Sequence, residues 1–314
     1  MAEKQATREA YGKALVALGA ENPDIVVLDA DLSKSTKTAE FAKAYPERFL
    51  NMGIAEQNML GTAAGLAAAG KIPFASSFAV FATGRAFEQI RNSIAYPKLN
   101  VKIAATHAGI TVGEDGATHQ AIEDVAIMRA LPNMTVLVPA DGVETRQAVF
   151  AAAKLQGPVY IRMGRLELPV LFDENYRFEI GKANVLREGK DAAIVANGVM
   201  VAIALEAAEM LAKEGIAVTV VNAASVKPFD NETLLQVAKQ VKAVVTAEEH
   251  TVIGGLGSAV AEVLAEAWPL PLVRVGLQDT FGESGRPYEL LEKYGLTKER
   301  LVAAVKEALN KVSR

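Results

Sequence analysis

Residues 105–120 gather side chains that could carry acid–base chemistry. Two of the three histidines in the chain, His107 and His119, lie here with Glu114 and Asp115 between them, and three glycines interrupt the run. Imidazole gains and loses a proton near neutral pH, and a loop that leaves the carboxyl end of a strand is a favoured catalytic position. A structural interpretation, with Asp115 in a turn and His119 on the surface, is the alternative.

Glu56 is the second candidate, because it places one carboxylate in the segment 51–59, where a strand gives way to a helix. A glutamate in the first helical turn is often structural, since it interacts favourably with the helix dipole. A carboxyl group surrounded by Met, Ile, Ala and Leu is also suited to sharing a proton with a ligand nitrogen. The pattern alone does not decide between the two.

Both candidates depend on the elements around them. Segments with helical periodicity alternate with short β-branched runs, which is typical of βαβ units and a buried parallel sheet. In such sheets ligands bind beyond the carboxyl ends of the strands, where both candidates lie. The predicted strands of this first domain fall within residues 24–32, 49–53, 72–78, 100–107, 134–140 and 158–164.

A polar stretch with acidic turn residues interrupts this rhythm, and the alternation then resumes over a shorter length. We therefore predict a first domain at 1–172, a linker at 173–189 and a second, smaller α/β domain at 190–314. Gly254–Ser258 opens a helix in the second domain, but one short glycine motif is weak evidence for dinucleotide binding and suits close packing better. His250 is left without a role.

The composition excludes several classes of function. The 33 basic and 37 acidic residues are interspersed, so the sequence contains no polybasic stripe that could bind nucleic acid or anionic lipid. The chain has no cysteine, which excludes disulfides, thiolate nucleophiles and thiolate metal sites. The first residues, MAEKQATREAYG, show no apolar signal region, so we expect a cytoplasmic protein.

Four motifs make the chain similar to transketolases. NMGIAEQNMLGTAAGLAAAG, SSFAVFATGRAFEQIR, THAGITVGEDGATHQAIEDVAIMRALPNMTVLVPAD and GPVYIRMGR follow one another in the order of that family. The resemblance spans essentially the whole chain and implies an α/β fold, with a thiamine-diphosphate-binding (pyrimidine-type) parallel-sheet domain followed by a transketolase C-terminal-like domain. It also implies a transferase of the pentose phosphate pathway that occurs as two polypeptides.

The resemblance gives several residues a role toward the cofactor. Glu56 matches the glutamate that hydrogen-bonds N1′ of the aminopyrimidine and so promotes removal of the thiazolium C2 proton. Phe78 and Phe81 match aromatic residues of the pyrimidine pocket, and Asp31 matches an aspartate near the cofactor. Where the family often has a third aromatic residue, this chain has Gly84, which puts the stacking on that side in doubt.

Toward the sugar, the resemblance implies that His107 and His119 face the reacting carbon and that Asp115 binds the C2 hydroxyl of the donor. Arg165 matches the phosphate-binding arginine, and a planar, permanently charged guanidinium suits a phosphate oxyanion. Arg8 and Ser35 match two further phosphate contacts.

The chain lacks the magnesium motif of thiamine diphosphate enzymes, a GDG followed roughly 25 to 30 residues later by an asparagine. Its nearest string is Glu114-Asp115-Gly116, and Asn133 follows too soon. The resemblance therefore implies that an N-terminal subunit supplies the Mg²⁺ and diphosphate ligands, in a heterotetramer of two chains of each kind.

Other functions stay open at this stage. The β subunit of a 2-oxo acid dehydrogenase shares the domain pairing, but its substrate is not a sugar, so it does not need residues that bind a sugar phosphate. 1-Deoxyxylulose-5-phosphate synthase is a further relative, usually made as one long chain. A non-catalytic regulatory partner subunit and a nicotinamide dehydrogenase are alternatives from other classes, disfavoured by the set of site residues and by the glycine pattern respectively.

Overall fold

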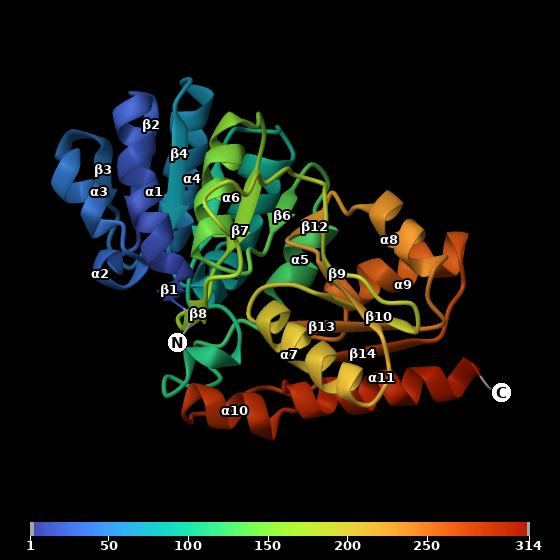
Figure 1. Cartoon of the computed structure of the whole chain (residues 1–314). Coiled ribbons are helices and arrows are strands. Elements are labelled where there is room, and N and C mark those ends of the chain that lie inside the picture. The colour runs from blue at the N-terminus through green and yellow to red at the C-terminus, as the bar shows by residue number, and fades with distance from the viewer. Residues whose placement is uncertain (1–2, 313–314) are drawn as a thin grey trace.

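The computed structural model describes residues 3–312 and shows two mostly parallel β-sheets side by side, each flanked by helices (Figure 1). The first sheet has seven strands in the order β12-β6-β7-β5-β4-β2-β3. All pairs are parallel except that of β12 with β6. The strands are β2 (Ile25–Asp29), β3 (Phe49–Asn51), β4 (Ile72–Ser76), β5 (Lys102–Ala105), β6 (Thr135–Leu137), β7 (Val159–Arg162) and β12 (Ser225–Lys227).

Helices cover both faces of this sheet, which explains why central strands such as β2 carry apolar residues on both faces. Successive residues of β2 point to opposite faces, so Val27 packs with one group of helices and Leu28 with the other. On the Val27 face lie α1 (Thr7–Glu21), α3 (Ala39–Ala44) and α6 (Gly142–Lys154). On the Leu28 face lie α4 (Glu56–Ala68), the helical segment η3 (Gln89–Ala95) and α5 (Asp124–Ala130).

Short elements complete the first part of the chain. They are β1 (Lys4–Ala6), paired antiparallel with β8 (Glu167–Pro169), and the helical turns α2 (Ser33–Thr36), η1 (Pro46–Arg48), η2 (Phe81–Arg85) and η4 (Ile110–Val112). Of these, α2, η2 and η4 follow the carboxyl ends of β2, β4 and β5. These turns therefore lie at the edge of the sheet where the candidate residues were expected.

The second sheet has five strands in the order β14-β13-β10-β11-β9, with only β9 antiparallel to its neighbour. They are β9 (Asn184–Arg187), β10 (Ala192–Ala196), β11 (Val218–Asn222), β13 (Val244–Thr251) and β14 (Leu272–Leu277). One face packs against α7 (Met200–Lys213), α10 (Pro287–Lys293) and α11 (Lys298–Val312), and the other against α8 (Asn231–Ala238) and α9 (Leu256–Ala267).

The predicted α/β fold is confirmed, with one feature that the sequence pattern did not show. Strand β12 follows the second domain's β11, yet it joins the edge of the first sheet beside β6. Strand β9 likewise lies inside the predicted linker 173–189 and pairs with β11. The division at 172 and 190 stays a prediction. Among the described residues no helix is long and apolar enough to cross a membrane.

Candidate active site

Glu56 begins α4, just after β3 and a turn in which Gly53 has φ +68°. Its side chain is 1% exposed, and the helix start favours a carboxylate there. The guanidinium of Arg85 donates from Nη1 to Oε2 over 2.8 Å, while the hydroxyl of Ser77 lies 3.5 Å from Oε1. Glu56 is therefore a buried carboxylate with one close cationic partner and one oxygen that is only weakly engaged.

Four aromatic side chains from three segments meet beside this carboxylate. The ring of Phe78 stacks on His107 with 3.9 Å between centroids, and Phe81 lies 6.0 Å from Phe78. The rings of His119 and Phe81 form a T-shaped pair with 5.1 Å between their centroids. The structure thus brings together both predicted aromatic residues and both predicted histidines, which are separated by up to 41 positions in sequence, from 78 to 119.

Gly84, noted for replacing an aromatic residue, lies in η2, and a Cβ built on it would meet nothing within 4 Å. The neighbouring Arg85 covers the ring of Phe81, with its guanidinium carbon 4.5 Å from the ring centroid. A cation rather than an aromatic side chain therefore borders this edge of the cluster.

His107 follows β5 in a left-handed conformation, φ +56°, that a residue with a side chain rarely adopts. Its Nδ1 lies 2.9 Å from the hydroxyl of Thr106. Burial, reinforced by the charges of Arg8 and Arg165, lowers the pKa of His107 to about 3. The imidazole is consequently neutral at physiological pH, which leaves Nε2 able to donate or accept a hydrogen bond.

The three predicted phosphate contacts lie near one another. Arg8 donates from Nη1 to the backbone oxygen of Ser35 over 3.0 Å, and its buried Nε has no protein partner. Arg165 donates to the backbone oxygen of Val112 and, over 3.2 Å, to Glu114. Each guanidinium lowers the pKa of His107, so both cations lie within electrostatic reach of the aromatic cluster.

The remaining two predicted residues lie at the periphery of the site. Asp31 is exposed, has φ +64° and accepts a hydrogen bond from Asn51 over 3.0 Å. Asp115 is exposed in the loop that ends at His119. Both are accessible to a ligand that approaches the carboxyl edge of the first sheet.

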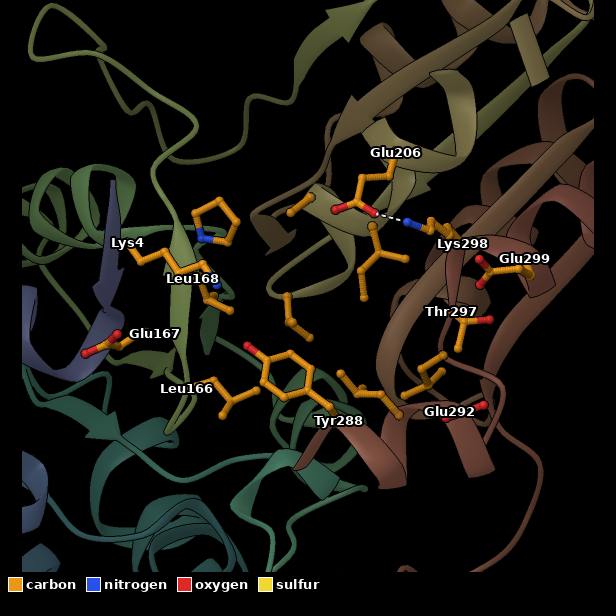
Figure 2. A pocket seen from close by; sticks show the side chains of 16 residues that line it. Lys4, Leu166, Glu167, Leu168, Glu206, Tyr288, Glu292, Thr297, Lys298 and Glu299 are labelled. Atoms are coloured by element: carbon orange, nitrogen blue, oxygen red, sulfur yellow. Dashed lines mark hydrogen bonds and ion pairs between the residues drawn. The ribbon is translucent and has the colours of Figure 1, made fainter. Parts of the chain in front are cut away.

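A pocket of about 300 Å³ opens next to this region but does not contain it (Figure 2). Its lining includes Leu166, one residue beyond Arg165, and Tyr288 of α10 points into it toward Leu166. At the other side Lys298 pairs with Glu206. None of the candidate residues lines this pocket.

Sequence reasoning missed Arg85, although it lies in one of the quoted motifs, four residues after Phe81. No periodicity marks it, because its importance comes from contact with Glu56, 29 positions away. A second missed group is the buried set Tyr160, Arg162 and Asp124. The carboxylate Oδ2 of Asp124 accepts from Tyr160 at 2.5 Å and from Arg162 at 2.7 Å.

Comparison with known proteins identifies the family. Residues 3–170 match the model described as the transketolase pyrimidine binding domain, and residues 181–301 match the transketolase C-terminal domain. The chain belongs to the transketolase family. The predicted resemblance is confirmed, and a pyrimidine-binding domain of this family implies thiamine diphosphate as the cofactor.

Three transketolase relatives give the comparison more detail. A solved structure titled "Split gene transketolase, inactive beta4 tetramer" is 68% identical, with a TM-score of 0.92, and the match covers 97% of this chain and 98% of that one. A Methanocaldococcus jannaschii protein whose name describes a transketolase C-terminal section is 52% identical over 97% of this chain and 96% of its own. The 6-deoxy-6-sulfo-D-fructose transketolase subunit SqwH of Clostridium sp. is 48% identical over 97% and 95%.

Proposed function

We propose that this chain is the C-terminal subunit of a split transketolase and supplies the pyrimidine side of a thiamine diphosphate site. With an N-terminal subunit it would transfer a two-carbon ketol unit from a ketose phosphate to an aldose phosphate. The observation that carries the proposal is the buried Glu56 beside a cluster of two phenylalanines and two histidines, with Arg8, Arg85 and Arg165 around it.

The residues present fit the cofactor. Glu56 is a desolvated carboxylate whose Oε1 is met only by Ser77 at 3.5 Å, so it can share a proton with a pyrimidine nitrogen. Phe78 and Phe81 provide ring faces beside it for an aromatic ligand. When bound, thiamine diphosphate supplies the carbanion chemistry, and the protein supplies position and electrostatics.

The residues of the chain have separate tasks in this proposal. Glu56 holds or returns a proton at the pyrimidine N1′. The neutral His107 and the neighbouring His119 offer hydrogen bonds to the hydroxyl and carbonyl oxygens of the sugar. Asp115 accepts from a donor hydroxyl, and Asp31 lies at the cofactor side.

Arg8, Ser35 and Arg165 would hold the phosphate of the sugar. The buried, unpaired Nε of Arg8 is a donor without an acceptor, which suits an anionic ligand. The same arrangement distinguishes the proposal from a 2-oxo acid dehydrogenase subunit, whose small substrate has no terminal phosphate to bind.

A second polypeptide is required because the sequence lacks the GDG motif that holds Mg²⁺ and diphosphate. The face next to Glu56 is open: Ile54 is 78% exposed, and a Cβ added at Gly61 or Gly65 of α4 would meet nothing within 4 Å. We propose that the N-terminal subunit covers this face, with two chains of each kind in the complex.

The test is to assay the purified chain alone and after mixing with an N-terminal transketolase subunit from the same organism, with thiamine diphosphate and Mg²⁺ present. We expect a folded but inactive chain that gains ketol transfer only in the mixture. Ketol transfer by the chain alone, or none in a mixture that forms a complex, would contradict the proposal.

The preference of the complex for one donor sugar over another is tested by a separate assay. One relative is named for a sulfonated sugar, and a sulfonate, like a phosphate, presents oxygens that a guanidinium can bind. Comparing kcat/KM for fructose 6-phosphate and 6-deoxy-6-sulfofructose with the same complex decides between them. We expect the phosphate ester to be preferred.

A further inference from the structure

The histidine loop, residues 107–113, adopts a backbone that needs support from outside. His107 and Gly109 have φ +56° and +80°, and after the turn η4 Gly113 has φ +87°. A non-glycine residue in this conformation is uncommon and costs free energy, so it persists only where its surroundings over-determine it. The support in this chain comes from the second domain.

Glu249 of β13 contacts the loop directly. Its Oε1 accepts a hydrogen bond from the backbone N–H of Thr111 over 2.6 Å. A Cβ built on Gly109 would lie 2.2 Å from the Glu249 carboxyl group, so the carboxyl occupies the space that a side chain at Gly109 would need. The side chain is 4% exposed, and no water competes easily for this contact.

The backbone of Glu249 is itself fixed to the first domain. Its carbonyl oxygen accepts from Nη2 of Arg162 over 2.9 Å, and the same nitrogen donates to Ala121 over 3.2 Å. Ala121 also contacts the histidine loop, because the N–H of Gly109 donates to the same backbone oxygen of Ala121 over 2.8 Å. Arg162, Glu249 and the loop thus form one continuous hydrogen-bonded unit across the two domains.

We propose that Glu249 is a positioning residue, which holds the 109–111 turn and through it sets the orientation of His107 against Phe78. This inference rests on the proposed function for its catalytic meaning. It gives the second domain a task in the reaction although that domain supplies none of the predicted site residues.

Glu248 offers a matched control. It lies in the same strand at 1% exposure, but its carboxylate accepts from the N–H groups of Leu256 and Gly257 at the start of α9, away from the loop. E248A therefore removes a buried carboxylate from β13 without touching the histidine loop. E249Q is the conservative variant, because glutamine keeps an oxygen that can accept from Thr111.

The first measurement uses the isolated full chain labelled with ¹⁵N-histidine, which carries three histidines. E249A should shift the ring signals of His107, and E249Q should largely restore them. E248A should leave His107 unchanged and instead affect His250, whose Nδ1 lies 3.7 Å from Glu248.

The second measurement is the kinetics of the two-subunit complex. E249A should lower kcat by roughly tenfold to a hundredfold, as expected for a displaced catalytic group, with a much smaller change in KM for the sugar donor. E249Q should keep most of the wild-type kcat. E248A should also keep it, even where its melting temperature falls as far as that of E249A.

An E249A chain with wild-type His107 signals and wild-type kcat would overturn the inference, leaving Glu249 a purely structural residue. The two proposals fail differently. If the wild-type complex transferred no ketol unit, the proposed function would fall, while the His107 signals of the isolated chain would still decide whether Glu249 holds the loop.

Discussion

The guanidinium of Arg85 lies 2.8 Å from the carboxylate of Glu56, and the two residues differ sharply in exposure: the glutamate side chain is 1% exposed and the arginine side chain 47%. The buried carboxylate therefore has its charge balanced from the open side of the site. Arg85 engages Oε2, so Oε1, which is met by Ser77 at 3.5 Å, is the oxygen that stays available to a ligand.

Removing Arg85 should leave Glu56 as a buried acceptor without its cation. We expect R85A to lower the free energy of unfolding of the isolated chain by about 1–3 kcal/mol. In an E56Q background the same change should cost much less, because a neutral glutamine needs no cation. Chemical denaturation of the four proteins of this double-mutant cycle measures the coupling.

The pair of Lys71 and Asp24 provides the control, since its atoms also lie 2.8 Å apart but both side chains are roughly half exposed. K71A should cost no more than about 1 kcal/mol, the usual range for a solvent-screened pair. Equal costs for R85A and K71A would show that burial of Glu56 adds nothing to its interaction with Arg85.

E56Q should leave thiamine diphosphate bound in the two-subunit complex but slow the exchange of its C2 proton for deuterium. Glutamine keeps the size and one hydrogen bond, yet it cannot exchange a proton with the pyrimidine, so the rate should fall by at least ~10²-fold together with ketol transfer. Glu40, an exposed glutamate in the first turn of α3, is the matched control. Similar exchange rates in E56Q and E40Q would make Glu56 an ordinary helix-start residue.

Much of the fold could be predicted from sequence because the strands of the first sheet are covered on both faces. Residues such as Val27 and Leu28 must both be apolar, and the resulting short β-branched runs stand out between amphipathic helices. Since the carboxyl ends of parallel strands meet at one edge, the chemical residues that follow them, such as Glu56 and His107, could be expected to lie near one another.

The contacts that orient those residues could not be predicted in the same way. Arg85 and Glu249 reach their partners across 29 and 138 positions of sequence, and each sits in a segment whose local pattern is satisfied without that contact. The position of strand β12 at the edge of the first sheet could not be predicted for a similar reason. Pairing between distant strands is decided by tertiary packing rather than by local propensity.

R165A should raise KM for phosphorylated sugars and affect hydroxypyruvate, an unphosphorylated donor, much less. Loss of a charge-assisted hydrogen bond should cost about 1.5–3 kcal/mol, or roughly a tenfold to hundredfold drop in kcat/KM. Arg177, which is exposed and donates to backbone oxygens such as that of Asn175, supplies the control variant R177A. Equal losses for both kinds of donor would place Arg165 outside the phosphate site.

His107 should stay neutral throughout the physiological pH range. Its pKa in the folded chain is lowered to about 3, first by burial and then by the charges of Arg8 and Arg165, from an ordinary value of 6.5. Because the unfolded chain takes up the proton more readily, the contribution of His107 to stability is constant above about pH 6.5 and is lost as the pH falls toward 3.

Comparison with H107N isolates this effect from other titrating groups. The difference in unfolding free energy between the wild type and H107N should be flat above pH 7 and should fall by about 1.4 kcal/mol per pH unit between about pH 6 and pH 4. The ¹⁵N signals of the His107 ring should show no titration from pH 5 to pH 8. A midpoint near 6.5 would mean that the ring is solvated and can act as a cation. A ring that does not titrate would show that His107 stays a neutral imidazole with Nδ1 paired to Thr106, the form in which we propose that it faces the sugar.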